Sequence, residues 1–284
     1  MSSEYSFRIV IYIEDYCCDV MINGIPVIRN YSGNQISSTV AVNQFILNGP
    51  NVLSSDIFVD ASSYGPVPSL DVKLQATNKK SKSDWFTVAE LQSKGKLSEG
   101  ELDSNVGSSK LGTYQSSIVS IDANTEIGTI SRDINIVSNL PDWGWKNSKK
   151  ISKDSIELES LSNSYTLIHN LLKVLSEGEL SGINDLRGVL SELILELSLA
   201  FNISAEDVFK GLKLVSTATD NEFSLMPFNV PSTYWETEIV ANGKLVRMYP
   251  PDRDDLLAFI HESGFVQSFD FWFRYDGNVW RPVR

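Results

Sequence analysis

The stretch Ser138-Asn-Leu-Pro-Asp-Trp-Gly-Trp-Lys-Asn-Ser-Lys-Lys-Ile-Ser-Lys153 separates two kinds of hydrophobic pattern. Before it, apolar residues recur about every second position, as in strands, and after it about every 3.6 positions, as in helices. The stretch combines proline, glycine and lysines, although Trp143 and Trp145 favour packing at a contact between domains. We therefore predict a linker at 138–153 that joins a domain 1–137 to a domain 154–284.

Residues 1–137 carry the signals of an all-β sandwich. Tyr5–Ile13 is rich in β-branched and aromatic residues, as strands are. The Asn23-Gly24 pair predicts a tight hairpin that places Ile22 opposite Ile25 and Val20 opposite Val27. Further strands are predicted at 36–47, 52–59, 70–76, 85–91, 117–121 and 129–137. The segment 93–113, with much glycine, serine, lysine and glutamate, is predicted to be a mobile loop.

The first part of the second domain has helical periodicity. Six apolar residues step by three or four positions and predict one buried helix face: Leu158, Leu161, Tyr165, Ile168, Leu172 and Leu175. Asp154 and Glu157 have the spacing of a capping box before this helix. A second helix is predicted over Leu186–Phe201, with Leu195 and Leu199 widening its buried face. Ser204 and Asp207 predict the start of a third, short helix.

The last part of the chain returns to strand patterns. The Asn242-Gly243 turn predicts three cross-strand pairs: Val240 with Leu245, Ile239 with Val246, and Glu238 with Arg247. The Asp276-Gly277 turn predicts Phe273 opposite Trp280, and 256–261 fits either a strand, which we favour, or a short helix. The predicted fold class is thus a β-sandwich followed by an α+β domain, in which three helices pack on one curved antiparallel sheet.

Composition and charge exclude several classes of function. The 284 residues are 42% hydrophobic and carry a formal net charge of −12. Nucleic acids and anionic membranes bind through clustered cations, so neither is expected as a partner. Charged residues interrupt the first fifteen positions, and no apolar run is long enough to span a bilayer. We therefore expect neither a signal peptide nor a transmembrane helix, and a cytoplasmic location.

Sequence motifs for catalysis, cofactors and metals are missing. The phosphate-binding, dinucleotide-binding, zinc-protease and serine-hydrolase motifs are all absent. Cys17 and Cys18 have no partners at the spacing of metal ligands, and the only histidines, His169 and His261, are distant from them in sequence. We expect no enzymatic activity, no cofactor and no metal.

Two stretches resemble known families. Asp19-Val-Met-Ile-Asn-Gly-Ile-Pro-Val27, followed by Asn48-Gly-Pro-Asn-Val-Leu53, is similar to galactose-binding-like and immunoglobulin-like β-sandwich modules, which implies carbohydrate binding. The helices and the meander that ends in Phe273-Arg-Tyr-Asp-Gly-Asn-Val-Trp280 resemble the cystatin-like cone fold of nuclear transport factor and ketosteroid isomerase. That resemblance implies a pocket for a small molecule.

Two sets of residues are candidates for function. Asp252, Asp254 and Asp255 form the densest acidic cluster, and with an exposed Trp272 they are predicted to bind a partner. A cone-fold pocket would be lined by Tyr165, His169, Trp235, Asp270 and Phe271, with Asp270 the nearest carboxylate for acid–base chemistry. The alternatives for the acids are a solvated turn or a calcium site, and the calcium-loop spacing is missing.

The acidic charge and the missing motifs favour a binding protein over an enzyme. An acidic two-domain chain of this kind is similar to bacterial immunity or accessory proteins of toxin systems, which implies a protein partner with a basic patch. A small-molecule or catalytic pocket in the second domain and carbohydrate binding by the first are the alternatives.

Overall fold

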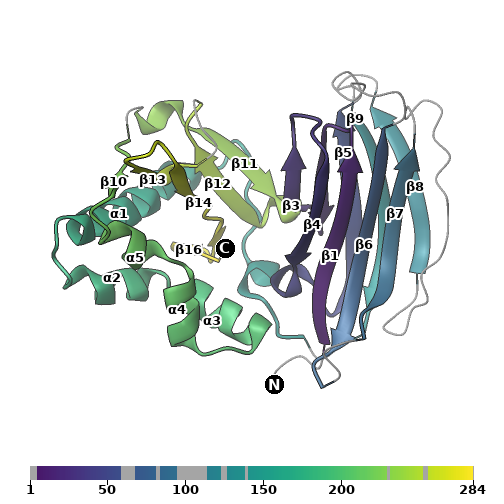
Figure 1. Ribbon diagram of the computed structural model, residues 1–284, viewed down its shortest axis with the longest axis horizontal. Coiled ribbons are helices and arrows are strands. Elements are labelled where there is room, and N and C mark those ends of the chain that lie inside the picture. The colour runs from purple at the N-terminus through teal and green to yellow at the C-terminus, as the bar shows by residue number, and fades with distance from the viewer. Residues whose placement is uncertain are drawn as a thin grey trace. The chain divides into compact units, whose positions relative to one another are not determined.

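The computed structural model describes residues 5–58, 68–80, 84–94, 114–122, 127–137, 140–228, 231–251 and 255–283, with the backbone alone for 114–122. This part of the chain is mostly β, with four antiparallel sheets and five α-helices (Figure 1). It divides into two compact units, Met1–Asp142 and Trp143–Arg284. The unit boundary falls inside the predicted linker 138–153, and the domain limits themselves stay a prediction.

The first unit consists of two sheets that lie face to face, one of four strands and one of five (Figure 1). One has the order β4-β1-β6-β7, from β1 (Tyr5–Glu14), β4 (Ile36–Ala41), β6 (Ser69–Asn78) and β7 (Phe86–Lys94). The other has the order β3-β2-β5-β9-β8, from β2 (Cys18–Ile22), β3 (Ile25–Asn30), β5 (Gly49–Phe58), β8 (Tyr114–Asp122) and β9 (Ile127–Ile136). These strands confirm the predicted β pattern, although the strand predicted at 36–47 ends at Ala41 and is followed by a turn of 3-10 helix, Asn43–Phe45. The predicted loop 93–113 begins with the last two residues of β7, and the rest lies outside the described residues.

The core of the first unit follows from strand alternation. Every second residue of β1 is buried, namely Phe7, Ile9, Ile11 and Ile13, and Cys18, Val20 and Ile22 of β2 follow the same rule. The two sheets thus bury one face each.

The first hairpin differs from its predicted register by one residue. Asn23 and Gly24 both have positive φ, and Ile22 pairs with Ile25 as predicted. Val20, however, pairs with Ile28 instead of Val27, because the register shifts after Val20. Pro26 on the facing strand has no N–H to continue a regular ladder, and such positions are common at bulges.

The helices of the second unit are α1 (Leu158–Ser176), α2 (Gly182–Val189), α3 (Ser191–Phe201), α4 (Ala205–Gly211) and α5 (Leu214–Ala218). The buried residues of α1 are the six of the predicted stripe, which confirms that helix. Ser204 accepts a hydrogen bond from the Asp207 amide at 3.0 Å and caps α4, as predicted.

Three details of the helical prediction are wrong. The predicted helix over Leu186–Phe201 is two helices, because the backbone leaves helical geometry at Leu190. Leu195 and Leu199 are 57% and 37% exposed, so neither widens the buried face. Asp154 does not cap α1, whose N-cap residue is Glu157 and carries no side-chain cap bond. Five α-helices therefore stand where three were predicted.

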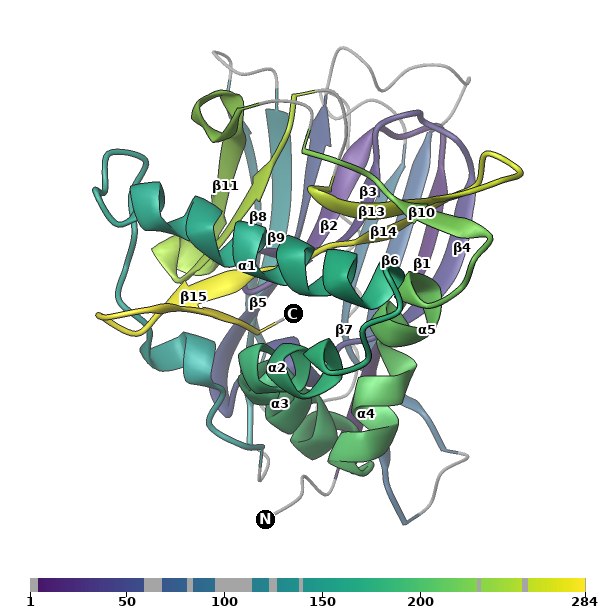
Figure 2. The ribbon, with the colours of Figure 1, turned by 90° about the vertical axis from the view of Figure 1, so that its left-hand side faces the viewer.

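The strands of the second unit form two sheets in place of the single predicted one. The first has the order β10-β13-β14, from β10 (Phe223–Leu225), β13 (Leu257–His261) and β14 (Val266–Phe269). The second has the order β11-β12-β15-β16, from β11 (Glu236–Val240), β12 (Leu245–Tyr249), β15 (Phe273–Tyr275) and β16 (Trp280–Pro282). Helix α1 lies across both sheets (Figure 2).

The two predicted hairpins of this unit have different outcomes. All three predicted pairs between β11 and β12 are present, including Glu238 with Arg247. In the last hairpin, Trp280 pairs with Tyr275 instead of Phe273. The Asp276 carboxylate accepts hydrogen bonds from the amides of Asn278 and Val279 and so holds a longer loop than the predicted two-residue turn. Residues 257–261 form a strand, as favoured.

The C-terminal part of the predicted linker is hydrogen-bonded within the second unit. The Lys149 amide donates to the Tyr275 carbonyl at 3.0 Å, and the Ile151 amide donates to the Gly243 carbonyl at 2.7 Å. Ile151 is 5% exposed and belongs to the core of this unit. The segment from 149 to 151 is therefore part of the unit and not a free connection.

The turn at Gly243 yields a stability prediction. Gly243 has φ +85°, and a Cβ there would lie 2.7 Å from the Ile151 carbonyl oxygen. Gly264 has the same φ, but a Cβ would meet nothing within 4 Å. We expect Gly243→Ala to lower the free energy of unfolding by about 2 kcal/mol, through backbone strain and the clash, and Gly264→Ala by about 1 kcal/mol, through strain alone. Equal losses in urea unfolding would contradict the close approach.

Candidate functional site

Three residues of the predicted pocket, Tyr165, Trp235 and Phe271, come together, but in a packed aromatic cluster. Tyr165 on α1 is 2% exposed; its hydroxyl donates to the Phe271 carbonyl at 2.9 Å and accepts from the Met248 amide at 3.1 Å. Burial raises the pKa of this hydroxyl. The Trp235 ring lies 6.3 Å from the Tyr165 ring, edge to face. Tyr165 and the 4%-exposed Phe271 belong to the core, so they do not line an open mouth.

His169 lies one turn further along α1, at the margin of this cluster. Its Nε2 is 3.2 Å from the Met226 carbonyl oxygen, which can only accept, so Nε2 carries a proton. Its ring packs 4.2 Å from the ring of Phe228. These contacts give His169 a packing role beside the cluster.

Asp270 belongs to a second group, which we call the Arg247 centre: Arg247, Glu238, Asp255, Asp270 and Trp272. The Arg247 guanidinium lies 2.7 Å from Glu238, 3.2 Å from Asp270 and 3.4 Å from Asp255. It also lies 5.3 Å from the centre of the Trp272 ring, within range of a cation–π interaction. Burial lowers the pKa of Arg247, but the charges of Asp270, Glu238 and Asp255 outweigh this and raise it.

The Arg247 centre carries more negative than positive charge. Three carboxylates surround one guanidinium, so these groups sum to −2 when all are ionised. The Arg247 side chain is only 7% exposed, whereas those of Glu238 and Asp270 are 25% and 32% exposed. The groups of the centre that reach solvent are therefore carboxylates. The centre includes Glu238 of β11, which is an outer strand of its sheet and also carries the exposed Glu236.

The predicted partner-binding residues have mixed outcomes. Asp255 is a member of the Arg247 centre, whereas Asp252 and Asp254 lie outside the described residues. The prediction that Trp272 is exposed is wrong, since its side chain is fully buried and its Nε1 donates to Asp270 at 3.0 Å. Arg247 was recognised from sequence only as the partner of Glu238. Its other two carboxylates, Asp255 and Asp270, lie two residues before β13 and directly after β14, and their approach to Arg247 on β12 depends on how two separate sheets pack.

A small cleft of about 180 Å³ lies elsewhere in the second unit. Helices α1 and α3 and strand β16 contribute to its wall, which combines the rings of Phe273 and Trp280 with the charged Glu192 and Arg281. Glu192 forms ion pairs with both Arg274 and Arg281. Prediction from sequence missed this cleft, because none of its charged residues belongs to a recognisable motif.

Glu196 lies one helical turn beyond Glu192 and is buried. It is 6% exposed, and its carboxylate accepts a hydrogen bond from the Gly144 amide at 2.6 Å. Burial raises the pKa of Glu196 to about 7, against the opposing effect of the Gly144 hydrogen bond, and the neighbouring Glu192 raises it further. A carboxyl group with such a pKa beside a cleft is able to exchange a proton near neutral pH.

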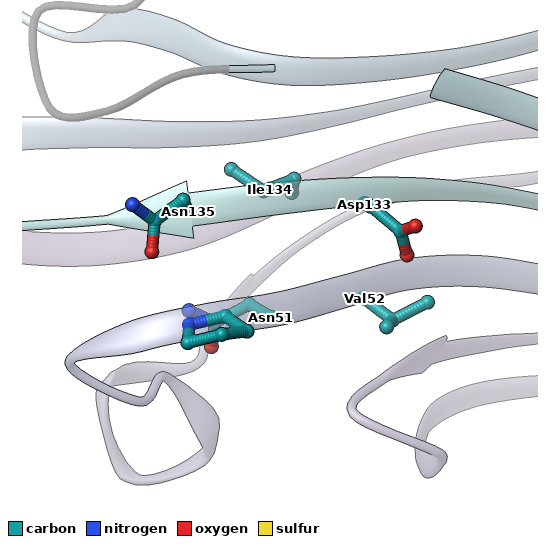
Figure 3. A pocket seen from close by; sticks show the side chains of 6 residues that line it. Asn51, Val52, Asp133, Ile134 and Asn135 are labelled. Carbon is teal, nitrogen blue, oxygen red and sulfur yellow. The ribbon is translucent and has the colours of Figure 1, made fainter. Parts of the chain in front are cut away.

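The first unit has an open groove of about 450 Å³ along β5 and β9. Figure 3 shows Asn51 and Val52 on one strand and Asp133, Ile134 and Asn135 on the other. The Asn51 side chain is hydrogen-bonded within the turn. Its Oδ1 accepts from the Leu47 amide at 2.7 Å, and its Nδ2 donates to the Leu47 carbonyl at 2.8 Å. None of the six lining residues is aromatic, so this groove offers no ring on which a sugar could stack.

Comparisons with known proteins add no assignment, because no family model, curated protein or solved structure matches this chain. The described ranges contain no group of three or more His, Cys, Asp or Glu side chains that could hold a metal ion. None of the helices described is both long and apolar enough to cross a membrane.

Proposed function

We propose that this chain is a two-domain, non-catalytic binding protein of the cytoplasm that sequesters a protein partner with a basic patch, as a bacterial immunity or adaptor protein would. Its parts would be an N-terminal β-sandwich and a C-terminal α+β domain. The observation that supports this proposal is the surplus negative charge of the Arg247 centre beside the outer strand β11.

Charge of this kind favours a cationic partner in two ways. Complementary charge speeds encounter between two proteins and disfavours partners of the wrong sign. The carboxylates of Glu238 and Asp270 are held in place by one buried guanidinium, so they present fixed negative charge to solvent. A fixed charge loses less side-chain freedom on binding than a mobile one.

A second candidate function is binding or transformation of a small molecule in the second unit. The cleft beside Glu192 favours it, because it combines aromatic walls with charged groups. Glu196, one helical turn from Glu192, has a pKa raised to about 7. The cleft's volume of about 180 Å³ suits only a small ligand or a single side chain. Carbohydrate binding by the first unit has less support, since the groove there lacks an aromatic platform.

The proposal predicts charge-dependent capture of a basic protein. The wild-type chain would be immobilised and exposed to lysate of its native host, beside the variant Glu236→Gln with Glu238→Gln. A control with the same net charge carries Glu159→Gln and Glu179→Gln, both at exposed positions. We expect wild type and control to retain a basic protein whose association rate falls about tenfold or more from low to high salt, and the β11 variant to bind it at least several-fold more slowly.

Two results would contradict the proposal. One is a retained partner whose association rate ignores salt. The other is an equal rate for the β11 variant and the control, because the charge of the Arg247 centre would then play no part.

A further inference from the structure

Strand β14 is an outer strand with an accessible edge. It pairs with β13 on one side, and no described strand pairs with its other side. Val266 at its start is 47% exposed, the preceding Phe265 is 58% exposed, and Ile260, directly opposite Val266, is 41% exposed. An outer strand with apolar side chains at its surface is a template for pairing with another chain.

Three hydrogen bonds show which backbone groups of β14 face the open edge. The His261 amide donates to the Phe265 carbonyl, and the Gly264 amide to the His261 carbonyl, both at 2.8 Å. These bonds make His261 and Phe265 a hydrogen-bonded pair of the hairpin. On the far side of β13, Ala258 receives a hydrogen bond from the Met226 amide, so its carbonyl points away from β14. In an antiparallel ladder, bonded and non-bonded pairs alternate. The pair of Ala258 with Ser268, and that of Ile260 with Val266, are therefore non-bonded pairs between β13 and β14. Val266 and Ser268 thus direct their N–H and C=O groups toward the open edge.

Acidic residues lie at both ends of β14. Asp270, a member of the Arg247 centre, follows its last residue, and Glu262 lies in the turn before its first. Glu222 is close to that turn, since its side chain lies 2.8 Å from His261. Strands β10, β13 and β14 and the turn 262–265 contain no lysine or arginine. The edge is thus a short strand with exposed apolar side chains at its start, between two negative ends.

We infer that β14 is the docking strand for the partner, which adds an extended segment as a fourth strand to β10-β13-β14. The inference rests on the proposed function and specifies its partner: about four residues of strand-forming, partly apolar sequence with lysine or arginine at each end. Four residues of strand span about 13 Å, the length of β14. Main-chain hydrogen bonds from Val266 and Ser268 would supply affinity, and the flanking charges specificity.

Charge argues against a second copy of this chain as the occupant. Two β14 strands paired edge to edge in antiparallel fashion would bring Asp270 of one copy near Glu262 of the other. Like charges opposite one another disfavour pairing. A basic segment gains from the same groups.

The test uses the capped synthetic peptide KKVTVTKK and the full chain. Ser268→Pro removes an outward N–H and leaves the hydrogen bonds between β13 and β14 in place, and Ser268→Ala is the matched control that keeps the N–H. We expect the peptide to bind wild type and Ser268→Ala with similar affinity and Ser268→Pro at least tenfold more weakly. Hydrogen exchange at the amides of Val266 and Ser268 in wild type should slow when the peptide is bound.

Each outcome of this test decides the inference. Equal binding to Ser268→Pro, or slowed exchange only at other strands, would overturn it while the binding of a basic partner stands. If wild type does not prefer KKVTVTKK over EEVTVTEE, the proposed function fails as well. Self-association of wild type that Ser268→Pro abolishes would assign the edge to a second copy and overturn the inference. If Ser268→Pro does not fold, as judged by its thermal transition, the exchange measurement on wild type decides.

Discussion

Replacement of Arg247 by methionine should lower the free energy of unfolding by about 3–5 kcal/mol at neutral pH. The guanidinium is the shared counterion of Glu238, Asp255 and Asp270, and its side chain is 7% exposed. Methionine fills similar space but removes the guanidinium that these three carboxylates share. Removal of one partner from a buried ion pair is costly because the remaining charges have lost their solvation by water.

Urea unfolding of wild type and Arg247→Met would measure this loss. The matched control is Arg187→Met, because Arg187 also contacts a carboxylate, Glu206 at 2.7 Å, but its side chain is 41% exposed. The control should lose about 1 kcal/mol or less. A loss of unfolding free energy no larger than that of the control would show that the Arg247 guanidinium does not stabilise the carboxylates of the Arg247 centre.

The elements predicted from sequence were those that depend on neighbours close along the chain. The buried face of α1, the Ser204 cap and the Glu238–Arg247 register were all predicted correctly, because periodicity, capping and tight turns act over a few residues. The last hairpin failed by two residues, because the side chain of Asp276 lengthened the loop. A turn motif predicts the backbone conformation of its two residues, but not the hydrogen bonds that an aspartate side chain makes to the backbone after it.

The candidate site could be predicted only in part, for a different reason. The rings of Tyr165 and Trp235 were expected together and do lie together, but sequence periodicity does not tell a filled cluster from an open pocket. Trp272 stands in an aromatic run whose pattern left both faces apolar. Its Nε1 bonds Asp270, two residues before it, but its ring packs against Arg247 of β12, which lies 25 residues earlier in the chain. The Arg247 centre arises from packing between two sheets, which no local signal encodes.

The Glu196 carboxyl should make the chain less stable as the pH rises toward neutrality. Its pKa is raised from an ordinary value of 4.5 to about 7 in the folded protein, because burial disfavours the ionised form. Between these two values the folded state holds a proton that the unfolded state has released, so the free energy of unfolding falls with increasing pH. The stability that depends on this proton is present below about pH 4.5 and lost above about pH 7, and it amounts to about 2–3 kcal/mol.

Glu196→Gln should remove this loss. Glutamine resembles the protonated acid, and its side-chain oxygen is able to accept the hydrogen bond that the Gly144 amide donates to Glu196 at 2.6 Å. We expect the variant to match wild type near pH 4.5 and to exceed it by about 2–3 kcal/mol near pH 8, in urea unfolding measured across that range. The control Glu159→Gln changes an exposed carboxylate of α1 and should shift stability little at either pH. A Glu196→Gln variant that is less stable than wild type near pH 8 would show that the buried carboxylate is stabilised by its neighbours Arg274 and Gly144, and that its proton is not held at neutral pH.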